Sequence, residues 1–214
     1  MEWRRCMQIV VPLVIVVALP GAAAAKALVI PPRPGQVGLS IEGSYGALTQ
    51  SGDIGSDFGN GPGLAVRLRY RTRYERAIGL SFESQKFDFR GTGPFRDPYT
   101  GVEVPADSSE APASVTWITW GLDIYQLFGT RTNTTRMLSG GVGLVSGGHY
   151  NLNSGETEYL TSDGYYLSAG AGVEHFFWRS WAWDLNARYM AVFHESTVNN
   201  VLQATAGVVV YASY

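Results

Sequence analysis

Cysteine is almost absent from this chain. The one cysteine, Cys6, lies in an apolar N-terminal segment, so the chain without that segment has no thiol, no disulfide and no cysteine-based metal site. Lysine occurs only at Lys26 and Lys86, and charged residues make up 16% of the chain, whereas roughly a quarter is usual. The formal net charge is −2, so the composition lacks the excess of basic residues that is typical of nucleic-acid-binding proteins.

A long apolar run is also missing after the N-terminal segment. A membrane-spanning helix needs about 20 consecutive apolar residues, and the sequence beyond residue 27 contains no such run. Amphipathic windows with a 3.6-residue period are absent too. Many short segments instead alternate apolar and polar residues, and this alternation predicts an all-β fold.

The first 27 residues have the order of a cleaved secretory signal peptide. Two arginines precede an apolar stretch over residues 7–19, and small residues follow at 22–25. We expect cleavage after Ala24, Ala25 or Ala27. An uncleaved N-terminal anchor is the alternative. Residues 28–36 are proline-rich and are expected to form an extended periplasmic lead-in.

The remaining chain, residues 37–214, is expected to be one domain of eight strands. The strands are predicted at residues 37–48, 63–71, 77–87, 114–128, 137–148, 165–177, 181–194 and 201–214. Strands of roughly 9–14 residues are long for soluble proteins but suit a tilted crossing of an apolar band.

The connections between these strands alternate in length. Long polar segments at 47–62, 88–113 and 149–164 alternate with short turns at 72–76, 129–136 and 178–180. Residues 195–200 are short but fall on the long-loop side. This pattern predicts an eight-stranded antiparallel up-and-down transmembrane β-barrel in a bacterial outer membrane, with extracellular loops and both termini periplasmic.

One face of each strand carries small and charged residues, which we expect to fill the bore. Glycines suit a crowded interior, and charges of both signs can pair there. The predicted ion-pair network contains Glu42, Arg67, Arg69, Arg71, Glu83, Asp123, Glu174, Asp184 and Arg188. The apolar face carries aromatic residues expected to form interfacial girdles, namely Tyr45, Tyr70, Trp120, Trp181, Tyr189, Phe193 and Tyr214. A soluble barrel or sandwich with the two faces reversed is the alternative.

The last predicted strand carries a spaced pattern of Thr205, Gly207, Val210, Ala212 and Tyr214. It resembles the terminal signal that the outer-membrane assembly machinery recognises, except that an aromatic residue is usual in place of Ala212. With its eight strands, the chain resembles the small outer-membrane barrels of the OmpA, OmpX and opacity types. The resemblance implies insertion by the barrel-assembly complex and contact with outer-membrane lipid and lipopolysaccharide. It transfers no ligand and no reaction.

Catalytic signals are weak. His194 and Ser196 have the His-x-Ser spacing of lipid A deacylases, but no carboxylate follows Ser196 to orient the imidazole. His149, His175 and His194 are too scattered for a metal site, and the acidic residues near Asp53 lack the spacing of an EF-hand. No cofactor is expected.

The expected function is therefore structural or surface-interacting. Binding sites tend to lie on loops carried by a rigid scaffold, so an extracellular partner would contact residues 47–62, 88–113 and 149–164. A narrow channel for ions or small solutes is one alternative, and a lipid A-modifying enzyme is another.

Overall fold

The computed structural model describes residues 32–49, 57–91, 94–96, 103–159, 163–194 and 197–212. The predicted signal peptide lies outside these residues. Every regular element described is a strand, and no described helix is long and apolar enough to cross a membrane. The elements are β1 (Val37–Leu48), β2 (Asn60–Arg73), β3 (Arg76–Asp88), β4 (Phe95–Arg96), β5 (Glu103–Val104), β6 (Pro112–Phe128), β7 (Thr134–Leu152), β8 (Thr157–Tyr159), β9 (Gly164–Trp178), β10 (Trp181–His194) and β11 (Thr197–Tyr211).

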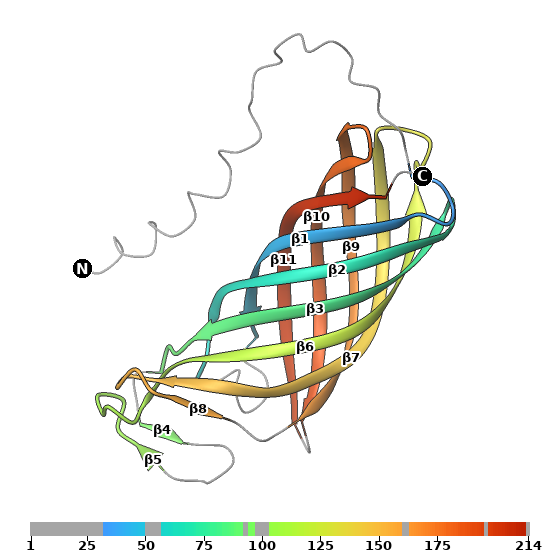
Figure 1. The fold of residues 1–214 in the computed structure, drawn as a ribbon. Coiled ribbons are helices and arrows are strands. Elements are labelled where there is room, and N and C mark those ends of the chain that lie inside the picture. Colours follow the sequence, from blue (N-terminus) through green and yellow to red (C-terminus); the bar gives the residue numbers. More distant parts are fainter. Residues whose placement is uncertain are drawn as a thin grey trace, which may run out of the picture.

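The eight long strands form one closed sheet. Their order around the barrel is β1, β2, β3, β6, β7, β9, β10 and β11, and β11 pairs with β1 to complete the ring. Each neighbouring pair is antiparallel, as Figure 1 shows. The predicted fold, an eight-stranded antiparallel up-and-down barrel, is confirmed.

The barrel has a loop end, where the long connections lie, and a turn end, where the short ones lie. The strand bounds differ from the prediction mainly at the loop end. β7 continues to Leu152 and pairs with the short β8, and β4 pairs with β5 inside the longest predicted loop. β11 covers Thr197–Tyr211 rather than residues 201–214. These loop segments pair because their backbone N–H and C=O groups form hydrogen bonds with one another. The composition of the loops does not reveal this pairing. At the opposite end, Pro34 and Gly35 form a turn rather than an extended lead-in, and the Gly35 amide donates to the Arg71 carbonyl.

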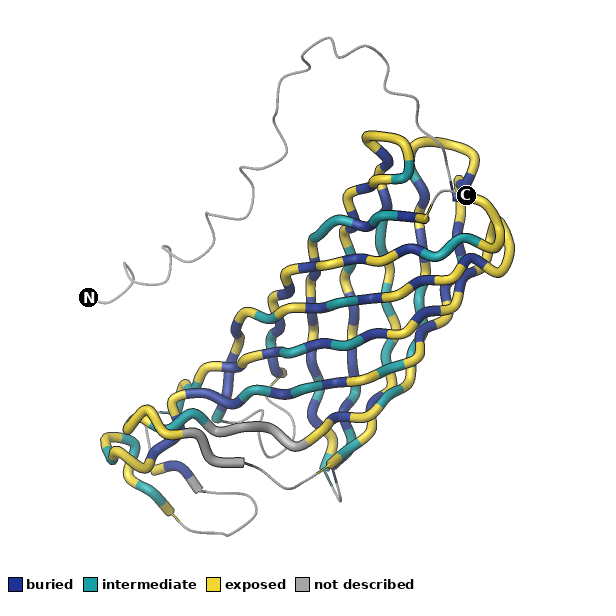
Figure 2. Tube along the Cα trace, viewed as in Figure 1, coloured by how far each residue is buried: buried dark blue, intermediate teal, exposed yellow. Residues whose placement is uncertain are grey.

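Side-chain exposure alternates along most of each strand, as Figure 2 shows by colour. An exception is the loop-end part of β6, where Ser114 and Val115 are both buried. On β6, Leu122 and Ile124 are 61% and 68% exposed, whereas Asp123 between them is 5% exposed. Alternation follows from the two-residue period of a strand, which places successive side chains on opposite faces. The aliphatic face is therefore outside and the charged face inside, as predicted for a membrane barrel and opposite to the soluble alternative.

The inward-facing side chains form three layers along the bore. Apolar residues close the turn end, in the clusters Ala77, Tyr125, Leu127 and Met137 and Phe176, Ala182, Val209 and Tyr211. Charged and amide side chains fill the middle. Another apolar cluster closes the loop end and includes Leu48, Phe58, Phe87, Phe95, Val115, Trp117, Val145, Tyr166, Met190, Val192 and Val201.

Glycine is required at Gly207, where a side chain would meet the neighbouring strand β1. A Cβ atom at Gly207 would lie 2.1 Å from the Ile41 carbonyl oxygen and 2.6 Å from Glu42 Cα. At Gly43, on the outer face of the neighbouring strand, the nearest atom would be the Ala206 carbonyl oxygen at 3.9 Å. The two glycines belong to consecutive residue pairs of the β1–β11 ladder, so their substitutions can be compared directly.

We expect Gly207→Ala to lower the free energy of unfolding by about 1–3 kcal/mol, because the backbone of β1 must move to make room. Gly43→Ala is expected to change it by less than about 0.5 kcal/mol. The measurement is urea unfolding of the barrel in vesicles, followed by tryptophan fluorescence. Equal effects of the two substitutions would contradict the close approach at Gly207.

Candidate functional site

The middle layer of the bore contains two groups of ion pairs. The first is built around Arg67 of β2, which bridges Glu42 of β1 and Glu83 of β3, with 2.7 Å between Arg67 Nη2 and Glu83 Oε1. The second oxygen of Glu83 pairs with Arg188 of β10. Thr205 Oγ1 donates to Glu42 at 2.6 Å. The four charged side chains of this group are at most 6% exposed.

The second group lies nearer the turn end of the bore. Arg69 bridges Glu174 of β9 and Asp184 of β10, with 3.0 Å from its Nη2 to Asp184 Oδ2. Arg71 Nη2 lies 2.6 Å from Glu174 Oε2. The Tyr211 hydroxyl donates to the other oxygen of Glu174 at 2.6 Å. The guanidinium groups also lie over aromatic rings, Arg69 over Tyr125 at 4.5 Å and Arg71 over Tyr211 at 5.1 Å.

Both groups cross the full width of the barrel. β2 and β9 are four places apart in the ring of eight strands, and so are β3 and β10, so each pair occupies opposite walls. The Arg71–Glu174 and Arg188–Glu83 ion pairs therefore span the bore. An eight-stranded barrel is narrow enough for two long side chains to meet across it.

The nine residues of the predicted ion-pair network are all in the bore, but one of them has no arginine partner in the described part of the chain. Asp123 is 5% exposed, and it accepts a 3.4 Å hydrogen bond from Tyr125 instead of pairing with an arginine in the described part of the chain. The sequence reasoning missed the neutral members of the network. Gln203 accepts from Arg188 at 2.9 Å and donates to Gln85 at 3.1 Å. Both glutamines alternate along their strands in step with the predicted inward charges. The same alternation rule, applied to amide side chains, would have placed them in the bore.

The apolar layer at the loop end was also missed. Phe58, Phe87 and Val115 are 0% exposed and Trp117 is 1% exposed. Phe58 makes edge contacts with Phe89 and Phe95, at ring-centroid distances of 5.6 and 6.0 Å. Phe58, Phe89 and Phe95 come from segments where the prediction placed polar connections, whereas Phe87 and Trp117 lie within predicted strands. Together they close the mouth of the barrel, and Phe95 belongs to β4.

Only one residue of the candidate catalytic pair, His194, belongs to the described structure. His194 is buried and faces the bore, and its ring is tilted against that of Trp117 at a centroid distance of 5.8 Å. Ser196 lies outside the described residues. Among the residues that the structure describes, no three histidine, aspartate or glutamate side chains are placed to hold a metal ion. The site is therefore a filled bore capped by loops.

Comparison with known proteins rests on structure. No family model matches the sequence, and no curated protein matches it. The fold is similar to Neisserial surface protein A (TM-score 0.52, 13% identity, covering 81% of this chain and 96% of that one). It is also similar to the outer membrane protein OprG from Pseudomonas aeruginosa (TM-score 0.57, 11% identity, covering 85% and 98%). This chain has the fold of the small eight-stranded outer-membrane barrels. The likeness supports an outer-membrane location, and at these identities it shows the fold alone.

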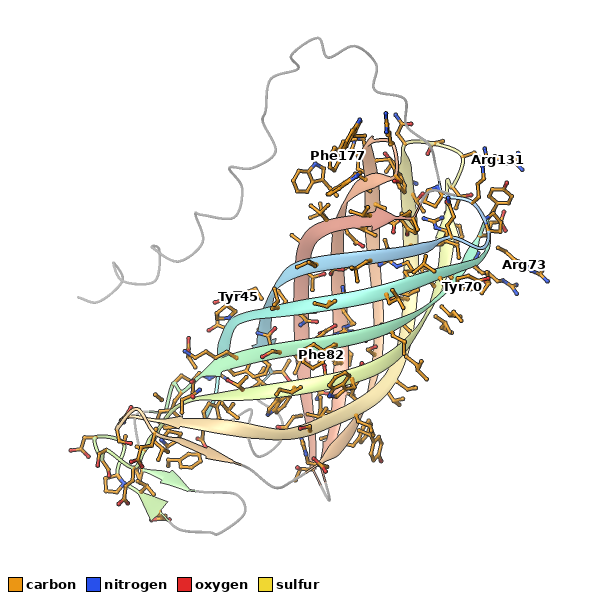
Figure 3. The ribbon with its side chains drawn as sticks, in the orientation of Figure 1. Tyr45, Tyr70, Arg73, Phe82, Arg131 and Phe177 are labelled. Carbon is orange, nitrogen blue, oxygen red and sulfur yellow. The ribbon has the colours of Figure 1, made fainter. Side chains whose placement is uncertain are left out.

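The outer wall of the barrel has aromatic residues near both ends, labelled in part in Figure 3. Tyr45 and Tyr189 are about half exposed toward the loop end, and Tyr165 stacks on Phe193 at 4.9 Å. At the turn end Tyr70 and Trp181 are exposed. These positions are those of interfacial girdles. Tyr214 lies outside the described residues.

Trp120 is an exception to the predicted girdle. It pairs with Phe82 at mid-strand, with ring centroids 4.4 Å apart. β6 begins at Pro112, before the predicted strand, and continues past the apolar band into the loop end, so Trp120 lies inside the band rather than at its edge.

The predicted assembly pattern lies on β11 and the residue that follows it. Thr205 faces the bore and bonds to Glu42, Gly207 is the close-approach position, and Val210 and Ala212 alternate outward. Thr205 and Gly207 therefore have structural roles in the barrel itself. Recognition of the pattern by the assembly machinery stays a prediction.

We expect Arg69→Met to destabilise the barrel by about 3–5 kcal/mol, because it leaves Glu174 and Asp184 in the bore without their shared cation. Lys86→Met is the matched control. Lys86 pairs with Asp88 at 3.1 Å, but both side chains are about half exposed, so the expected loss is below about 1 kcal/mol. Unfolding in urea, followed by heat-modifiable gel mobility, measures both. A loss below about 1 kcal/mol for Arg69→Met would contradict the structural role of the network.

Proposed function

We propose that this chain is a closed outer-membrane barrel that acts through its loop end, as a structural or surface-interaction protein. One observation carries the proposal: inward side chains at two levels have no solvent-accessible surface. Glu42, Arg71 and Glu174 in the middle layer are 0% exposed, and so are Phe58 and Phe87 at the loop end. A bore filled in this way leaves no continuous water path for a solute.

The order of the loop end supports a role in interaction. The Asn153 amide donates to the Ala111 carbonyl and the Ser154 amide to the Ser109 carbonyl, both at 2.9 Å, so the segment after β5 is fixed to the β7–β8 hairpin. β4 and β5 add a second small hairpin (Figure 1). A rigid scaffold that carries ordered loops is the usual arrangement of a recognition surface. A partner would bind on residues 47–62, 88–113 and 149–164, within a surface also bathed by lipopolysaccharide.

The proposed orientation places the loop end outside the cell. β1 begins and β11 ends at the end of the barrel remote from β4, β5 and β8 (Figure 1). Outer-membrane barrels have long extracellular loops and short periplasmic turns. Both termini of the domain are then periplasmic, where insertion by the barrel-assembly complex leaves them.

The closed bore is tested by conductance in planar bilayers. We expect the purified barrel to give no steady nanosiemens-scale openings, because cross-bore ion pairs and the apolar layer leave no water path. Heat-modifiable mobility of the same preparation serves as the control that the inserted protein is folded. Steady openings from folded protein would favour the narrow-channel alternative and contradict this proposal.

The orientation is tested by labelling single cysteines on intact cells. Glu110 on the loop side and Asn133 on the turn side are both exposed, so each can be replaced by cysteine without disturbing a buried contact. A membrane-impermeant maleimide is expected to label Glu110→Cys on intact cells and Asn133→Cys only after the outer membrane is opened. The reverse pattern would contradict the orientation.

A further inference from the structure

A depression of about 510 Å³ lies between the β2–β3 and β6–β7 turns, at the end of the barrel remote from the loops. The charged residues that line it are three arginines, Arg73, Arg76 and Arg131, and one carboxylate, Glu75. Figure 3 shows Arg73 and Arg131 at this end of the molecule, beyond Tyr70. None of the three arginines forms an ion pair within the described residues. The depression is therefore a concentration of positive charge without an anionic partner.

The charges of the two barrel ends are opposite in sign. The turn end contains six arginines and one acid, Glu75, the arginines being Arg33, Arg73, Arg76, Arg131, Arg136 and Arg179. The loop segments 49–59, 89–111 and 153–163 contain two cations, Arg90 and Arg96, and nine acids, Asp53, Asp57, Asp97, Glu103, Asp107, Glu110, Glu156, Glu158 and Asp163. Since the chain as a whole is near neutral, this separation gives the turn end alone a surface that attracts anions.

The basic depression continues into an apolar track on the outer wall. Arg76 is followed along the outer face of β3 by Ile78, which is paired with Ile124, and then by Leu80, which is paired with Leu122. These four aliphatic side chains are at least 50% exposed. Leu80, Leu122 and Val142 line a second depression of about 660 Å³ that is almost wholly apolar. Four residues of strand separate Arg76 from Leu80, or roughly 13 Å.

A basic depression followed by an apolar track matches the headgroup and the acyl chains of a phospholipid. A phosphate headgroup would contact the guanidinium groups, and its acyl chains would lie over the aliphatic track. Tyr74 and Phe128, both about half exposed at this level, are typical of the membrane–water interface and place the arginines at headgroup depth. Guanidinium groups bind phosphate through charge-assisted, often bidentate hydrogen bonds.

We propose that the depression between the β2–β3 and β6–β7 turns binds the phosphate headgroup of an anionic glycerophospholipid from the periplasmic leaflet. The choice of leaflet rests on the proposed orientation of the barrel. The choice of an anionic lipid rests on the three unpaired arginines against one carboxylate. The lipid fills the groove between two turns that the backbone of the barrel holds together, since the Leu127 amide donates to the Glu75 carbonyl at 2.8 Å.

The test is native mass spectrometry of the full-length barrel released from micelles that contain either dioleoyl-phosphatidylglycerol or dioleoyl-phosphatidylcholine. We expect phosphatidylglycerol to stay bound and phosphatidylcholine to be lost. Arg73→Gln/Arg131→Gln is expected to weaken phosphatidylglycerol binding by roughly thirtyfold, since each arginine near an anionic headgroup contributes about a fivefold factor. Both side chains are exposed, so the fold is retained.

The matched control is Lys86→Gln/Arg179→Asn, which removes two exposed cations that do not line the depression. It should bind phosphatidylglycerol like the unchanged barrel. Equal binding of the two lipids, or equal loss in both double variants, would overturn the proposal in favour of non-specific adsorption. Conductance and cysteine labelling of the same proteins report the closed bore and the orientation separately, so a failure of lipid binding is distinguishable from a failure of the proposed function.

Discussion

Ion pairs that cross the bore from opposite walls are the constraint around which the rest of this barrel is arranged. Arg71 of β2 reaches Glu174 of β9, and Arg188 of β10 reaches Glu83 of β3. Buried charges are costly unless they are paired and hydrogen-bonded, and here tyrosine, threonine and glutamine side chains supply the additional bonds. The closure of eight strands sets the distance between the opposite walls that these pairs span. Gly207 is needed for a separate reason, since a side chain there would meet the backbone of the neighbouring strand β1.

A filled, charged interior leaves two surfaces on which the protein can act. The aliphatic outer wall fits hydrocarbon, which cannot hydrogen-bond an open sheet edge, so the sheet is closed on itself. The two ends differ in structure and in charge. Mostly acidic loops lie at one end, and short, arginine-rich turns lie at the other. We propose that recognition occurs at the loop end and lipid contact along the wall and the turns.

Strand positions and the orientation of their faces could be predicted from the sequence because a two-residue alternation is a strong local signal. The inward charges, from Glu42 to Arg188, were found for the same reason. Their partners could not be assigned, because pairing across the bore depends on the stagger of the closed sheet. Asp123 bonds to Tyr125 rather than to an arginine for that reason. The aromatic closure around Phe58 was invisible because it joins residues far apart in sequence through loops that look polar.

The most direct test of this inside-out arrangement is the accessibility of spin labels placed one at a time along β6 in lipid vesicles. Labels at Leu122 and Ile124 should be relaxed strongly by oxygen, which partitions into hydrocarbon, and weakly by a water-soluble nickel chelate. A label at Asp123 should be reached poorly by both reagents, because its side chain points into a filled bore. Strong relaxation of Leu122 and Ile124 by the nickel chelate would place water, not lipid, against the aliphatic face and would contradict the arrangement.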